Sequence, residues 1–221
     1  MKQMLAAFAL FFLTLTASGQ DAVMSSWPYL YPEFSSGTVW MNDGKKYDRQ
    51  MNIHLAKGQL HFIDGGVIKE VNANDVVLAE LGGDRFTSLE GSIVKVIGDF
   101  ERGYVAVRTA ADYQKMNETD GPYGTKIDAG ATLSLTTFEL TGVASSYSEL
   151  LRNRNEGIEL PLKHDYYLVA GGKVLNASKK AVENSLDAAG KAAFKTFQKQ
   201  NKIKWQDPSS LLLLVDFLNG Q

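Results

Sequence analysis

Short apolar stretches separated by turn-forming residues fill the chain from residue 37 to about residue 109. Pairs such as Gly65-Gly66 and Gly82-Gly83 supply the positive φ angles that tight hairpin turns need. Connections this short cannot form the crossovers that parallel strands require, so the pattern predicts an antiparallel β-meander. The expected strands are residues 38–41, 46–55, 59–63, 67–71, 76–80, 92–98 and 104–109.

One hairpin permits a test of strand register. If Lys57-Gly58 is a two-residue loop, Leu55 faces Leu60 and Ile53 faces Phe62, so the apolar residues of both strands share one face. A shift of one residue would send the apolar residues of one strand to the other side of the sheet. The opposite face is then an open polar surface, made of Asn52, His54, Gln59 and His61.

Toward the C-terminus, the spacing of the apolar residues changes from two to between three and four, which indicates helices. Ser178 and Asp207 are predicted N-caps, with Pro208 at the first helical position after Asp207. The expected elements are a hairpin over residues 165–175 with its turn at Gly171-Gly172, and helices over residues 145–152, 179–186, 188–200 and 208–218.

The order of these elements defines the predicted fold class. Hairpins come first and helices last, so we expect an α+β fold: an antiparallel β-meander followed by a small C-terminal helical cap. A chain of 221 residues, 44% of them hydrophobic, is long enough to bury one full core. We therefore predict a single domain over residues 20–221, β-rich over 27–175 and helical over 178–219.

The first residues of the chain predict an export signal. Lys2 provides a positive start, residues 4–15 form an almost unbroken apolar run, and Ala17-Ser18-Gly19 offers small residues for cleavage before Gln20. The apolar run has about a dozen residues, whereas a membrane-spanning helix needs about 20. We therefore predict a signal peptide over residues 1–19 and an exported mature chain, periplasmic or secreted, without a transmembrane segment.

Charge and cysteine content exclude several classes of protein. With 23 basic and 25 acidic residues, the chain lacks the positive surface that a nucleic-acid-binding protein needs. The absence of cysteine excludes disulfide frameworks, thiolate metal sites and thiol catalysis. The chain also has no Gly-x-Ser-x-Gly nucleophile motif, and its acidic residues show no spacing typical of a catalytic pair. We expect no cofactor, and the sequence assigns no catalytic residue.

Three side chains are candidates for a metal site. In the register above, His54 faces His61, and Glu70 lies opposite His61 if Gly65-Gly66 is a two-residue loop. Two imidazoles and a carboxylate form a donor set suited to zinc or iron. A three-residue turn would instead place Lys69 opposite His61, so the donor set stays open. We favour the alternative interpretation, in which the two histidines are solvated cross-strand neighbours without an ion.

The stretch from Trp27 to Phe34 is the most unusual part of the chain. Its two prolines keep it extended, and Trp27, Tyr29 and Tyr31 alternate along it. Such a strip can stack on a glycan or a peptide, or it can be a strap that packs on the sheet and anchors the N-terminal segment. Large aromatic side chains are usually buried, so we favour the strap and keep the three aromatic residues as candidate ligand contacts.

Segments near both ends of the mature chain follow a known pattern. They are residues 28–34, with the sequence Pro-Tyr-Leu-Tyr-Pro-Glu-Phe, and residues 37–39, 43–45, 165–168, 197–203 and 211–218. Together with the Gly19-Gln20 cleavage context, these segments resemble an uncharacterised family of exported Bacteroidetes proteins. The resemblance covers most of the mature chain. It implies a single domain, β-rich first and helical last, in the envelope of a Gram-negative cell. No activity or functional residue is carried over from this family.

These observations lead to one functional hypothesis and two alternatives. We expect a non-catalytic binding or interaction module whose partner is another envelope protein, a glycan or a lipid. The first alternative is a hydrolase that acts on envelope glycan or peptide. The second is a carrier that holds a lipid or apolar ligand between a curved sheet and the C-terminal helices. The expected contact residues are Trp27, Tyr29, Tyr31, Asn52, His54 and His61.

Overall fold

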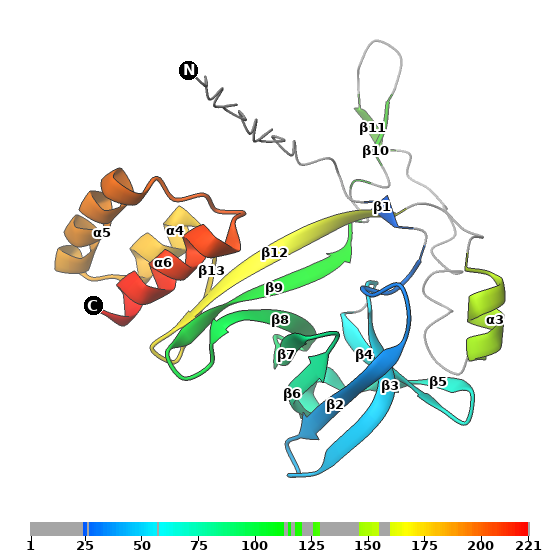
Figure 1. The fold of residues 1–221 in the computed structure, drawn as a ribbon. Helices are drawn as coiled ribbons and strands as arrows, with labels where there is room; N and C mark the ends of the chain where they lie inside the picture. The colour runs from blue at the N-terminus through cyan, green and yellow to red at the C-terminus, as the bar shows by residue number, and fades with distance from the viewer. Residues whose placement is uncertain are drawn as a thin grey trace, which may run out of the picture.

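The computed structural model describes residues 24–25, 27–56, 58–112, 115, 118–120, 126–128, 146–154 and 160–220. The predicted signal peptide over residues 1–19 lies outside these ranges, as does Lys57 of the predicted two-residue turn. An antiparallel sheet comes first along the chain and helices come last, so the predicted α+β class is confirmed (Figure 1).

The main sheet has eleven strands within the described ranges. Their order is β1-β12-β9-β8-β7-β6-β2-β3-β4-β5, with β13 beside β12, and neighbouring strands pair antiparallel. Two short strands, β10 and β11, pair separately. The strands are β1 (Met24–Ser25), β2 (Ser35–Met41), β3 (Lys46–His54), β4 (Gln59–Asp64), β5 (Val67–Val71), β6 (Val76–Leu81), β7 (Asp84–Leu89), β8 (Ser92–Asp99), β9 (Gly103–Ala111), β10 (Glu118–Asp120), β11 (Lys126–Asp128), β12 (Leu160–Ala170) and β13 (Lys173–Asn176).

The sheet consists of two meanders joined by a return of the chain. In the order of the sheet, β2, β3 and β4 separate β5 from β6, so that β6 lies beside β2. The sequence pattern did not predict this arrangement. In a flat sheet, β5 and β6 would lie about 19 Å apart. Five Cα steps, which include the 3₁₀ turn η1 (Ala73–Asp75), join Val71 to Val76 and span less than about 18 Å. The sheet must therefore curl, and β2–β5 acquire a concave inner face.

Neither β7 nor the pairing of β9 with β12 was predicted, and the short strands β1, β10 and β11 were not predicted either. β7 completes the second meander between β6 and β8. β12 begins at Leu160, well before the predicted start at residue 165, and pairs with β9 so that His164 lies opposite Thr109. The predicted turn at Gly171-Gly172 is confirmed, because Ala170 pairs with Lys173.

The predicted register of the β3–β4 hairpin is wrong by two residues. Ile53 pairs with Leu60, and His54 pairs with Gln59 and not with His61. The connection is a four-residue loop closed by a hydrogen bond from the Gly58 N–H to the His54 carbonyl (2.8 Å). The Gly58 carbonyl in turn accepts a hydrogen bond from the Ile93 N–H of β8 (2.7 Å), which holds the loop against the second meander. A shift of two residues leaves every side chain on its predicted face.

The helices follow the predicted boundaries closely. Ser178 caps α4, because its hydroxyl accepts a hydrogen bond from the Ala181 N–H, and Asp207 caps α6 in the same way through the Ser209 N–H. No helix within the described ranges combines the length and the apolar character needed to cross a membrane. The helices are α3 (Tyr147–Arg152), α4 (Lys179–Ser185), α5 (Ala188–Asn201) and α6 (Pro208–Asn219).

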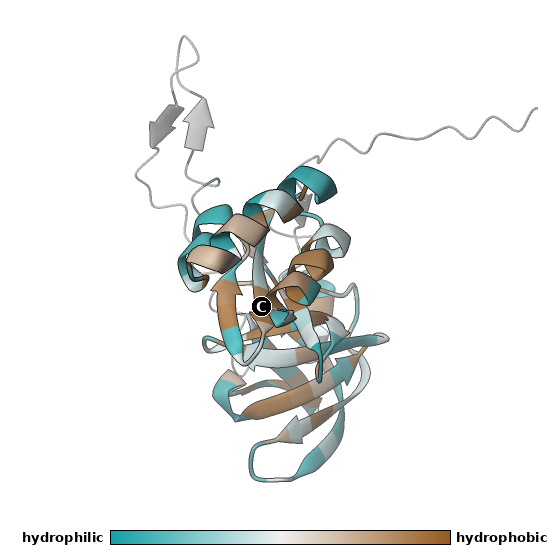
Figure 2. Cartoon of the chain, turned by 90° about the vertical axis from the view of Figure 1, so that its left-hand side faces the viewer, coloured by the Kyte–Doolittle hydropathy of each residue, from teal (hydrophilic) through white to brown (hydrophobic). Residues whose placement is uncertain are grey.

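The helical cap has its own apolar core against one end of the sheet. Helix α6 packs against β9 and β12 and buries Leu211, Leu214 and Val215 there. Phe194 of α5 is buried in the same cluster. Coloured by hydropathy, the helices in front of the sheet mix hydrophilic and hydrophobic segments, as amphipathic helices do (Figure 2). On α6, Leu213 remains 43% exposed.

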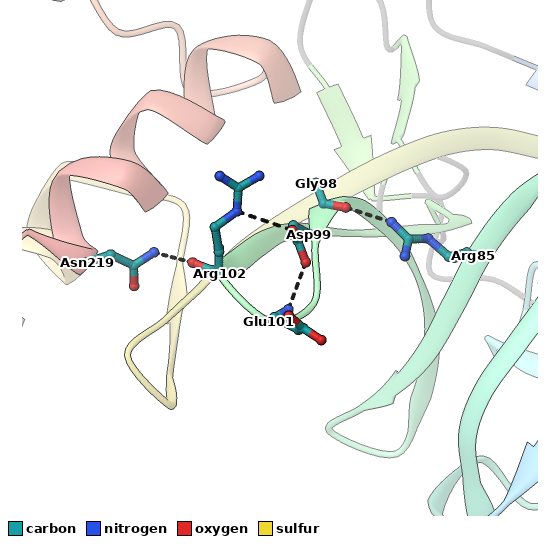
Figure 3. A network of polar contacts seen from close by, with 6 residues as sticks. All are labelled: Arg85, Gly98, Asp99, Glu101, Arg102 and Asn219. Atoms are coloured by element: carbon teal, nitrogen blue, oxygen red, sulfur yellow. Dashed lines mark hydrogen bonds and ion pairs between the residues drawn. The ribbon is translucent and has the colours of Figure 1, made fainter.

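The end of α6 holds two hairpin turns together, and Figure 3 shows its contact with the turn between β8 and β9. The Asn219 side chain donates a hydrogen bond to the Arg102 carbonyl in the β8–β9 turn, and its oxygen accepts one from the Gly171 N–H in the β12–β13 turn. Asp99 stabilises the first turn by accepting hydrogen bonds from the Glu101 N–H (2.9 Å) and from the Arg102 side chain (3.2 Å). The cap is therefore fastened to the sheet at its far end as well as along its length.

Candidate functional site

The strap (residues 27–34) runs beside β3 as an extension of the line of β2. Tyr29 forms an antiparallel bridge with His54, and the Leu30 N–H donates to the Ile53 carbonyl (2.9 Å). The Asn52 side chain holds the strap from the other direction, because its amide nitrogen donates to the Tyr31 carbonyl (2.8 Å). Trp27, Tyr29 and Phe34 are buried, in agreement with the strap interpretation.

Beneath the strap, a row of polar side chains crosses four neighbouring segments of backbone. The Tyr29 hydroxyl and His61 Nδ1 are hydrogen-bonded at 3.0 Å. Of the two registers that the sequence left open, the structure has the one that pairs His61 with Glu70, and His61 Nε2 lies 3.4 Å from a Glu70 carboxylate oxygen. The His54 and His61 rings stack with their centroids 4.8 Å apart. Both histidines are 0% exposed.

The prediction that these histidines are solvated is therefore wrong. Alternation along a strand shows which residues share a face, but it does not show whether another segment covers that face. Here the strap aromatics cover it together with Leu150 and Tyr147 of α3. Asn52 is also fully buried, and the strap backbone supplies its hydrogen-bond partners.

The same geometry bears on the predicted metal donors His54, His61 and Glu70. A ligating imidazole directs its lone pair at the ion in the plane of the ring. The two histidine rings lie within 18° of parallel and face one another, so their lone pairs do not converge. Among the described residues, no group of three histidine, aspartate or glutamate side chains is placed to hold an ion.

The predicted ligand contacts divide into two sets. Five of them, Trp27, Tyr29, Asn52, His54 and His61, lie in or beneath the strap and are buried. They fix the N-terminal segment to the sheet and present no open surface. The sixth, Tyr31, lies at the edge of a groove with a volume of about 350 Å³. This groove is formed by the strap, the curled sheet and the first turn of α6, and it is our candidate functional site.

The groove has an apolar floor and polar side chains at its rim. Successive inward-facing positions of β8 are Ile93, Lys95 and Ile97, so one lysine is placed between two apolar neighbours. The volume of the groove lies at the lower end of the range typical of small-molecule sites. The floor is completed by Ile53, Phe86 and Val107, and the remaining lining residues are Leu30, Tyr31, Asp84, Thr109, His164, Tyr166 and Pro208.

On the strap side, Asp84 connects two other groups. One of its carboxylate oxygens accepts hydrogen bonds from the Tyr31 hydroxyl (2.5 Å) and from Lys95 Nζ (2.8 Å). Burial alone would raise the pKa of Asp84, but these two hydrogen bonds and the positive charge of Lys95 outweigh burial and lower it. The pKa of the Tyr31 hydroxyl is raised, first by burial and then by the adjacent carboxylate. Asp84 and Lys95 thus neutralise each other.

On the opposite side, His164 and Thr109 face each other across the β9–β12 pair. The Thr109 hydroxyl and His164 Nδ1 are hydrogen-bonded at 2.9 Å. Burial lowers the pKa of His164 from its ordinary value near 6.5, although the charge of Asp165 acts in the other direction. The imidazole is therefore neutral at neutral pH, and it offers the groove one donor or acceptor without a charge.

The lowered pKa of Asp84 predicts a specific acid response. A carboxyl group with a folded-state pKa below its ordinary value contributes stability above that ordinary value, near 3.8, and loses it as the pH falls through the folded value. We expect an NMR titration of the Asp84 carboxyl carbon to give a midpoint below 3.8, and Lys95→Met to raise this midpoint. Lys45→Met, which removes a lysine paired with Asp43 elsewhere, should leave it unchanged. A wild-type midpoint at or above 3.8 would contradict the arrangement.

Most residues of the groove were not predicted to form a site. Lys95 between two apolar inward-facing residues was a usable signal, because a lysine on a buried face needs a partner. Asp84, Thr109 and His164 gave no comparable signal. The long-range pairing of β9 with β12 brings Thr109 and His164 together, and Asp84 meets the distant Tyr31 through its side chain. The chain was compared with protein-family models, curated proteins and solved structures, and no match was found in any of the three comparisons.

Proposed function

We propose that this chain is an exported, non-catalytic binding protein, and that its groove takes a neutral, hydroxyl-rich ligand, most simply a saccharide of the cell envelope. The observation that carries the proposal is the combination of an apolar floor with a polar rim whose charges cancel. The export part is supported by the predicted signal peptide over residues 1–19 and by the resemblance to exported Bacteroidetes proteins.

The charge balance of the rim supports a neutral ligand over an ionic one. Lys95 is already paired with Asp84, and His164 is neutral at neutral pH. The rim groups therefore offer no unpaired charge that would attract an anionic or a cationic ligand. Hydroxyl groups, in contrast, both donate and accept hydrogen bonds, as the rim groups Tyr31 and Thr109 also do. A sugar ring has an apolar face as well, which suits the Tyr166 ring and the apolar floor.

The same residues argue against hydrolysis in this groove. Asp84 is the one carboxylate among the groove's described lining residues, whereas most glycosidases use two carboxyl groups on opposite sides of the scissile bond. Its lowered pKa also keeps Asp84 ionised, so it has no proton to donate as a general acid. Binding is therefore the better-supported function.

An array of soluble oligosaccharides tests this proposal, followed by calorimetry with the best-bound sugar. The protein is purified after export, and its mass shows whether residues 1–19 have been removed. We expect at least one neutral saccharide to bind, and Thr109→Val and Lys95→Met each to weaken its binding about tenfold, because each loses one hydrogen-bonding group at the rim.

Lys45→Met is the matched control, since Lys45 is also paired with an aspartate but lies outside the groove. It should bind as the wild type does. The proposal fails if no saccharide binds at millimolar concentration, or if the Lys95 and Lys45 variants bind the sugar equally well.

A further inference from the structure

A second groove lies on the concave inner face of β2–β5, where Leu60 of its floor pairs with Ile53 of the first groove. Its volume is about 370 Å³. The floor consists of Val39, Met51 and Leu60, all buried. The walls come from four successive strands, and the curl of the sheet brings them around the same hollow. The wall residues are Met41, Tyr47, Arg49, Phe62, Asp64, Glu70 and Val71.

The upper walls of this groove are apolar but incompletely covered. Met41, Phe62 and Val71 are only half-buried, and Tyr47 is 39% exposed. An apolar hollow of this kind favours a ligand that covers its walls, because removing apolar surface from water is favourable in proportion to the area buried. An extended hydrocarbon chain has the right chemistry, and the flexible Met41 side chain can adapt to it.

The charged residues at the mouth of the groove determine which polar head group the ligand can carry. Asp64 is ion-paired with Lys69 of the neighbouring strand, so its negative charge is neutralised. Glu70 directs its carboxylate toward His61 on the opposite face of the sheet. Arg49 is exposed, and its guanidinium donates to the Asp48 carbonyl (2.9 Å), which carries no net charge. Arg49 also attracts Asp64 and helps to lower the pKa of that carboxyl, but the hydrogen bond of its guanidinium goes to an uncharged carbonyl, so its other N–H groups can bind a carboxylate.

We propose that this groove binds an anionic amphiphile, with its hydrocarbon chain along Met41, Phe62 and Val71 and its carboxylate on Arg49. A guanidinium forms two parallel hydrogen bonds with a carboxylate, which makes the acid a better ligand than an uncharged amphiphile of the same length. This site does not depend on the proposed saccharide function, because the two grooves share no lining residue.

Displacement of a fluorescent fatty acid, cis-parinaric acid, from the purified protein tests the site. We expect dodecanoate to displace the probe at a concentration about tenfold lower than dodecanol does. Arg49→Gln should abolish this difference and leave the affinity for dodecanol unchanged. Tyr47→Ser changes an exposed wall residue without opening the core, and it should weaken both competitors. Arg102→Gln, which removes an exposed arginine in a hairpin turn, is the matched control and should have no effect.

Three results would overturn the proposal. The first is the absence of probe binding. The second is equal displacement by dodecanoate and dodecanol, which would show that Arg49 does not bind the carboxylate. The third is a loss of probe binding in Lys95→Met but not in Tyr47→Ser, which would place the amphiphile in the other groove.

Discussion

Replacing Tyr29 by alanine is expected to destabilise the protein by about 3–5 kcal/mol, the range typical of truncating a fully buried aromatic residue. The Tyr29 ring is 2% exposed and contacts Trp27, Phe34 and both buried histidines edge-on or tilted. Its loss leaves a cavity between the strap and β3, and it removes the partner of His61 Nδ1. Urea unfolding followed by circular dichroism measures the change.

Tyr29→Phe is the matched control for this experiment. It keeps the ring and removes only the hydroxyl, so we expect it to cost about 1 kcal/mol, the value of one hydrogen bond. A shift of tryptophan emission in the alanine variant, before global unfolding, would report release of Trp27 with the strap. If the alanine variant is no less stable than the phenylalanine variant, the strap does not contribute to the core as described.

Gly103→Ala is expected to have the second-largest effect, about 3 kcal/mol or more. Gly103 has a φ of +107°, a conformation that residues with a side chain rarely adopt. An added Cβ would lie 2.7 Å from the Val169 carbonyl oxygen and 2.8 Å from a Val215 methyl group. The residue thus sits where the β8–β9 turn, β12 and α6 meet. Either the turn or the helix must move to accommodate a methyl group.

Gly44→Ala separates the steric effect from the backbone effect. Gly44 also has a positive φ, of +80°, but an added Cβ there meets no atom within 4 Å. We expect it to cost about 1 kcal/mol, from backbone strain alone. Thermal unfolding of both variants gives the comparison. Similar melting temperatures would show that the cap tolerates displacement at Gly103.

The turns and helix caps could be predicted because their signals are local. Glycine pairs mark the hairpin turns, and Ser178 and Asp207 mark helix starts through hydrogen bonds that reach only three residues or fewer along the chain. The β3–β4 register could not be derived in the same way. Alternation repeats every two residues, so it excludes a shift of one and accepts a shift of two. The contact of Gly58 with Ile93, far along the chain, selects the longer loop.

The candidate site was largely beyond prediction for a related reason. His54 and His61 were placed on one face correctly, and Glu70 was one of two residues left open as the neighbour of His61. The strap that covers this face leaves no mark in the alternation of β3 and β4. The groove depends on the pairing of β9 with β12 and on the hydrogen bond between Tyr31 and Asp84, both of which join distant segments. Of its rim, only Tyr31 was among the expected contacts.

The pairing of β9 with β12 has a consequence for folding kinetics. Thr109 and His164 are neighbours in space but lie more than fifty positions apart in the chain, so a large loop must close before the two strands can pair. Until then, β9 presents a free row of backbone donors and acceptors that another molecule can bind. Newly made chains should therefore be most prone to aggregate in the interval between completion of the second meander and arrival of β12.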